Sequence, residues 1–165
     1  MAYFLRYRVL CGKLVKNQSK SKMEELEALR KMVEDHDYSA ALTLIDEMDE
    51  MAKDDKIVKI QAYIKILLIH LIKQNAEKQT NKSWTRSIEN ALDGIFESNK
   101  RRSAKGFYLK PIEIEEAISE RFNKSLKDAS QEAFGGAYPV KVLSEMIDSE
   151  AIKKEALDLI LNYEL

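Results

Sequence analysis

From residue 23 onward, apolar side chains recur every three or four positions, the spacing of one face of an α-helix. The repeat predicts helices beginning near residues 23, 39, 57, 83, 111 and 149, and a shorter segment near 142–146. Strand-like alternation is confined to Tyr3, Leu5, Tyr7 and Val9. The pattern therefore predicts an all-α fold, an antiparallel bundle of about five to six helices.

Short polar segments between the apolar repeats predict where the helices begin and end. The second helix can be capped by Asp37 or Ser39, the fourth by Asn81 or Ser83, and the last by Asp148 or Ser149. The sequence KDDK at residues 53–56 shifts the phase of the repeat, so we expect the second helix to end there. Pro111 suits the first turn of a helix, and Gly135-Gly136 suits a helix end.

The helical repeat covers residues 23–165, which predicts one domain over that range. Residues 1–22 carry six basic and no acidic side chains. They lack the uninterrupted apolar stretch and cleavage site of a secretory signal. We expect a basic N-terminal segment, loose or outside the natural domain, with an arm that docks on a partner as the alternative.

The formal net charge of −1 conceals four blocks of alternating sign. Residues 1–22 carry +6, residues 23–72 carry −6, residues 73–110 carry +5 and residues 111–165 carry −6. Opposite blocks can attract each other within the fold or between copies, or a basic block can bind a polyanion. Pairing within the protein or between copies is the favoured interpretation.

His70 and Trp84 are predicted to meet where the third and fourth helices join. A short connection makes consecutive helices antiparallel, so Trp84 in the first turn of one would pack against the end of the other. We expect a structural lock between the two helices. Asp46, Glu47, His70 and Arg86 are also a candidate buried polar cluster, with a hydrogen-bond network favoured over a catalytic role.

The sequence contains few of the residue combinations that support catalysis. The two histidines, His36 and His70, are far apart, and the single cysteine, Cys11, belongs to the basic N-terminal segment. No nucleophile is paired with a base, no glycine-rich phosphate loop is present, and neither histidine has the Glu-x-x-His spacing of a bundle metal site. No catalytic residue, metal site or cofactor is predicted, and an enzyme with a Glu/His cluster is the weakest alternative.

Basic residues in and after the fourth helix form the candidate interaction surface. The predicted loop 98–110 has five basic and no acidic residues. The surface comprises Lys82, Trp84, Arg86, Lys100, Arg101, Arg102 and Lys105, and we expect it to line one end of the bundle. Such a surface could neutralise the phosphates of a nucleic acid, although no base-reading motif is present. A protein partner, or self-association as a homodimer, is favoured over nucleic acid.

The remaining features concern the compartment. A single cysteine is compatible with a reducing environment, so we expect a cytoplasmic protein. The longest central apolar run, residues 66–69, is far shorter than the roughly 20 residues that span a bilayer, so no membrane partner is expected.

Four segments carry a resemblance to a known family. They are LIDEMDEM, KILLIHLIK, SWTRSIENAL and FNKSLKDASQEAF. Their succession resembles the helical family catalogued as domain of unknown function twenty-nine, common in photosynthetic bacteria, over roughly residues 23–165. The most specific parts are residues 70–73 and Ser83-Trp84, whereas Gln74 stands where the family usually has an aromatic residue. The resemblance implies an all-helical fold and no particular activity.

Overall fold

The computed structural model describes residues 23–101 and 106–163. Contacts divide the chain into two compact units, with the division between Ala52 and Lys53. The described ranges contain helices and one isolated bridge, Lys100 with Phe107, and no strand, which confirms the predicted all-α helical bundle. The basic segment 1–22, with its strand-like alternation, lies outside the described residues, so the domain boundary at residue 23 stays a prediction.

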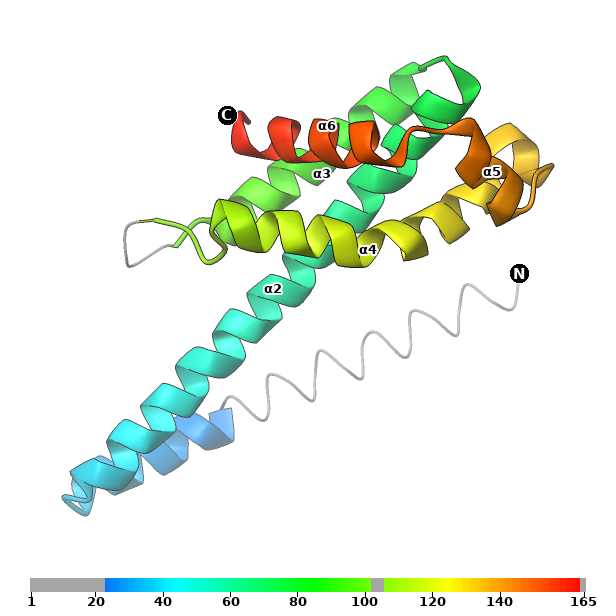
Figure 1. Ribbon diagram of the computed structural model, residues 1–165. Helices are drawn as coiled ribbons and strands as arrows, with labels where there is room; N and C mark the ends of the chain where they lie inside the picture. The colour runs from blue at the N-terminus through cyan, green and yellow to red at the C-terminus, as the bar shows by residue number, and fades with distance from the viewer. Residues whose placement is uncertain (1–22, 102–105, 164–165) are drawn as a thin grey trace. The chain divides into compact units, whose positions relative to one another are not determined.

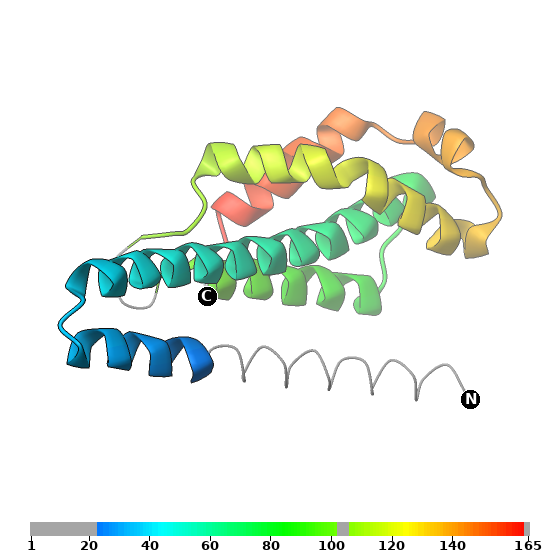
Figure 2. The same cartoon turned by 90° about the horizontal axis from the view of Figure 1, so that it is seen from below.

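The N-terminal unit contains a helical hairpin. Residues 23–34 are helical, and α2 (Tyr38–Glu77) begins after a short connection. The connection reverses the chain through His36, whose φ of 60° is left-handed. Asp37 caps α2, because its Oδ1 accepts a hydrogen bond from the backbone N of Ala40 at 3.1 Å. Figure 2 shows the two helices antiparallel and side by side.

The expected break at residues 53–56 is wrong, since α2 runs without interruption from Tyr38 to Glu77. Lysine and aspartate are compatible with an exposed helical turn, and no glycine or proline stands there to end the helix. The shift in the apolar repeat reflects a change in which side of one helix is covered. The predicted second and third helices are therefore one helix.

Four further α-helices and one 3₁₀ turn follow residues 53–77 of α2 in the C-terminal unit (Figure 1). They are α3 (Lys82–Asn99), α4 (Pro111–Glu132), η1 (Ala133–Gly136), α5 (Val140–Met146) and α6 (Ser149–Leu161). Asn81 caps α3 through a 2.9 Å hydrogen bond from Trp84 N, and Asp148 caps α6 through a 3.0 Å bond from Ala151 N. Pro111 is the first residue of α4, as predicted.

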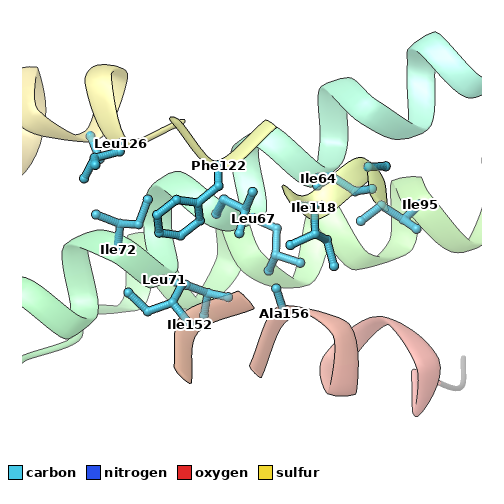
Figure 3. Packing of buried hydrophobic residues seen from close by; sticks show 14 of the residues in the cluster. Ile64, Leu67, Leu71, Ile72, Ile95, Ile118, Phe122, Leu126, Ile152 and Ala156 are labelled. Carbon is cyan, nitrogen blue, oxygen red and sulfur yellow. The ribbon is translucent and has the colours of Figure 1, made fainter. Parts of the chain in front are cut away.

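The apolar core lies within residues 53–165 and is built from every helix of that unit. α4 packs against α5 and α6, and α3 packs against α6. Figure 3 shows Phe122 of α4 among Leu67, Leu71 and Ile72 of α2, with Ile152 of α6 nearby. The core residues of α2 are fully or nearly fully buried. This core positions the polar groups at the ends of the helices.

One end of the C-terminal unit is closed by η1. The backbone is left-handed at Phe134, Gly135 and Gly136, with φ of 52°, 66° and 79°, which ends α4 at the predicted glycine pair. Phe134 is held in this conformation by Glu77 of α2, whose Oε1 accepts a 2.8 Å hydrogen bond from Phe134 N. The last turn of α2 is thereby joined to the end of α4.

Candidate functional site

A buried lysine joins three helices at this end of the C-terminal unit. Lys73 of α2 is only 6% exposed, and its Nζ lies 2.9 Å from Oε2 of Glu132 at the end of α4. The same Nζ lies 4.5 Å from the ring centroid of Trp84 in the first turn of α3, a cation–π contact. We call His70, Lys73, Trp84 and Glu132 the Lys73 cluster. The sequence predicted that His70 and Trp84 would join these helices, whereas the contact between the end of α2 and the start of α3 is made by Lys73 and Trp84.

His70 lies one turn before Lys73 on α2 and is half-buried. Its Nδ1 is buried and has no hydrogen-bond partner among residues 23–101 and 106–163, contrary to the expectation of a hydrogen-bond network. Burial lowers the pKa of the imidazole below its usual value, and the Lys73 ammonium lowers it further, while Glu132 acts in the opposite direction. The neutral imidazole therefore fits this site better than the charged form.

The lowered pKa of His70 predicts a dependence of stability on pH. Between the folded-state pKa and the ordinary value of 6.5, the unfolded chain binds more protons at this residue than the folded chain. The free energy of unfolding should therefore fall as the pH falls through 6.5, and this contribution is gone below the folded-state pKa. Urea unfolding between about pH 7.5 and 5 measures the effect. His70→Gln should flatten that part of the profile, and an unchanged profile would contradict the assignment.

The predicted polar cluster does not form a buried group. Asp46 and Glu47 are exposed side chains of the N-terminal unit. Arg86 is exposed on α3 and makes no hydrogen bond or ion pair with His70. The prediction failed because it assigned these charged residues to covered positions of the helices. The half-buried His70 instead has Lys73 and Glu132 as its charged neighbours.

The predicted basic surface is divided between two places. Lys82, Trp84 and Arg86 lie in the first turns of α3, whereas Lys100 and Arg101 follow its last residue. A helix of 18 residues is about 27 Å long, so the two groups lie at opposite ends of α3 and not at one end of the bundle. Arg102 and Lys105 lie outside the described residues. Trp84 is half-buried over Lys73 and so is not a fully exposed stacking platform.

The cations after α3 have local aromatic partners. Lys100 Nζ lies 5.6 Å from the ring centroid of Phe96, and the guanidinium of Arg101 lies 5.3 Å from that of Tyr108. The buried Asn99 side chain bonds both backbone groups of Leu109, at 2.7 Å and 3.3 Å. These contacts fix the described ends of the loop.

The N-terminal hairpin carries an exposed apolar surface that was not predicted from the sequence. Its side chains are 45–62% exposed, and we call them the hairpin face: Leu26, Val33, Tyr38, Leu42 and Ile45. Their helical spacing was visible in the sequence, but it predicted a side turned toward a core. Within the described residues 23–52, Ala41 alone is buried. Two amphipathic helices of about thirty residues in total are too small to enclose an apolar core of their own. The short length of this segment could therefore have indicated that its apolar side chains are exposed.

Metal-binding clusters and membrane-spanning helices were sought in the described part of the chain. Within residues 23–101 and 106–163, no group of three His, Cys, Asp or Glu side chains could hold a metal ion. Among the described helices, none combines the length and apolar content that a membrane crossing requires. Comparison with family models, curated proteins and solved structures finds no match to this chain.

Proposed function

We propose that this chain is a non-enzymatic helical protein-interaction module that binds its partner through the hairpin face. The supporting observation is the contrast between the two units. The core of residues 53–165 is extensive, whereas residues 23–52 present seven large apolar side chains to solvent, five of them in the hairpin face, over a single buried alanine. Apolar side chains gathered on one surface are typical of sites that bind another protein.

The charge of the hairpin favours a partner other than a second copy. Residues 23–52 carry ten acidic and two basic side chains, a formal charge of −8. Two such hairpins facing each other would repel, because like charges at an interface oppose association. The same charge disfavours nucleic acid at this surface. We therefore favour a different protein over a homodimer.

Two further proposals accompany this function. The single cysteine supports a cytoplasmic location, where thiols stay reduced. The resemblance to domain of unknown function twenty-nine also remains a proposal, and it rests on segments such as residues 70–73 and Ser83-Trp84. Neither proposal bears on how the hairpin face binds.

A pair of variants tests the binding surface in the full-length protein. The face variant, Leu26→Gln with Leu42→Gln, replaces apolar groups that are 55% and 62% exposed. The control variant, Val58→Gln with Ile112→Gln, changes groups that are 63% and 59% exposed and belong to the C-terminal unit. We predict that a protein purified stoichiometrically with the parent from its native cell is lost by at least tenfold with the face variant.

The control variant should retain that protein at the level of the parent. Circular dichroism on all three proteins should show equal helix content, because each substitution is at an exposed helical site and glutamine is a good helix former. Equal recovery of every associated protein by the parent and the face variant would refute the hairpin face as the binding surface.

A further inference from the structure

The exposed residues of the first hairpin helix form one stripe beside its packing side. Leu29 and Met32 are half-buried and mark the packing side of residues 23–34. Leu26 and Val33 are exposed and lie seven positions apart, which places them almost in line. At 100° per residue, this line is rotated by about 90° from the packing side.

The first part of α2 repeats this arrangement. Ala41 is buried and Leu44 is half-buried, so they mark the side of α2 that packs within the hairpin. Tyr38, Leu42 and Ile45 are exposed and follow one another at four- and three-residue spacing. Their stripe is also rotated by about 90° from the packing side, in the same rotational sense as the stripe on residues 23–34.

The two stripes therefore emerge on the same side of the hairpin. Antiparallel helices viewed from one end wind in opposite senses, so an equal rotation away from their shared contact turns both stripes to one side. Figure 2 shows the antiparallel course of the two helices. The hairpin face is thus an apolar surface contributed by two helices, the kind of surface on which a third helix packs in a bundle.

Acidic side chains extend and border this surface. Asp46 follows Leu42 by four positions and Asp49 follows Ile45 by four, so each carboxylate lies one turn beyond an apolar group of the same stripe. Both are exposed. With the charge of −8 on residues 23–52, they create a negative field around the apolar groups.

We propose that the hairpin face binds a cationic amphipathic helix of another protein, completing a three-helix bundle with residues 23–52. This inference rests on the proposed function and names the chemistry of the partner. Apolar side chains of the incoming helix cover the exposed apolar groups of the two stripes, and lysine or arginine at its margins faces Asp46 and Asp49. Since residues 23–34 span about 18 Å, the bound segment is about 12–15 residues long.

A synthetic peptide provides the test with the full-length protein. The probe is a fluorescein-labelled peptide of about 14 leucine and lysine residues, with leucine at the three- and four-residue spacing of one helix face. One control peptide has the same composition in scrambled order, and a second has glutamate in place of lysine. Fluorescence anisotropy should show saturable binding of the first peptide alone.

Protein variants then assign the binding to this surface. The face variant should weaken binding at least tenfold, and the control variant Val58→Gln with Ile112→Gln should not change it. Asp46→Asn with Asp49→Asn should weaken binding about fivefold, as expected for two exposed charge pairs, and reduce its dependence on salt.

A second charge variant distinguishes a local contact of Asp46 and Asp49 with the peptide from the effect of the overall negative charge of the hairpin. Glu47→Gln with Glu50→Gln removes the same charge from exposed positions of α2 that lie away from the two stripes. It should weaken binding less than twofold. Equal losses from the two charge variants would overturn the placement of cations beside Asp46 and Asp49.

The remaining outcomes overturn the proposal in different ways. Equal binding of the scrambled or glutamate peptide, or full binding by the face variant, excludes recognition of a cationic helix by this surface. If the lysine peptide does not bind, the proposal is also overturned. One way this could happen is that another segment of this chain already covers the hairpin face. If the face variant still loses its cellular partner in that case, the proposed function survives and only the partner chemistry is wrong.

Discussion

Phe122→Ala should lower the free energy of unfolding by about 3–5 kcal/mol, the usual cost of truncating an aromatic core residue. Phe122 is 4% exposed and lies between side chains of α2 and α6, which share the core with α4 (Figure 3). The alanine leaves a cavity where three helices meet, so the surrounding side chains cannot close it without moving helices. Urea unfolding followed by circular dichroism measures the loss.

Phe107→Ala is the matched control for this truncation. Phe107 is 55% exposed, and its ring makes an edge contact with Phe96 at a centroid distance of 6.4 Å. Its removal should cost about 1 kcal/mol or less. Similar losses from the two substitutions would show that the core is not organised around Phe122.

Glu132→Ala should destabilise the protein by about 2–3 kcal/mol, whereas Lys73→Met should cost less than about 1 kcal/mol. The asymmetry follows from burial, since the Lys73 side chain is 7% exposed and that of Glu132 is 53% exposed. Removing the carboxylate leaves a buried ammonium that still contacts the Trp84 ring but has lost the carboxylate of its ion pair. Removing the lysine leaves a carboxylate that water can solvate, and methionine keeps the apolar contact with the indole.

The double variant Lys73→Met with Glu132→Ala completes the comparison by the same unfolding assay. It should be more stable than Glu132→Ala alone, because the unpaired buried charge is gone. Equal costs for the two single substitutions would indicate that Lys73 is solvated in the folded protein and that the ion pair has little influence on stability.

Most helix boundaries followed from local sequence signals. Asn81, Asp148 and Pro111 act within one turn of their own position, and a capping hydrogen bond needs no information from distant parts of the chain. The helix end at Gly135-Gly136 was predictable for the same reason. The predicted break at residues 53–56 failed because a shift in apolar phase shows which side of a helix is covered, and not whether the helix ends.

The polar groups of the site depended on contacts that no local pattern contains. Lys73 looks like any lysine near a helix end, and its burial results from Trp84 and from Glu132, which lies 59 positions further along the chain. The exposure of Leu26 and Leu42 was equally hidden, because periodicity identifies an apolar side of a helix but not what covers it. Sequence reasoning therefore found the helices better than it found their surroundings.

Photo-crosslinking in the native cell tests the central claim that the hairpin face binds another protein. A photoreactive amino acid replaces Leu42 in the full-length chain, and in a separate control it replaces Ile112, which is equally exposed on α4. After irradiation, we predict a covalent adduct between position 42 and a lysine- or arginine-rich helical segment of one other protein, and no such adduct from position 112. Adducts from position 42 that join only residues of this same chain, or no adduct at all, would contradict it.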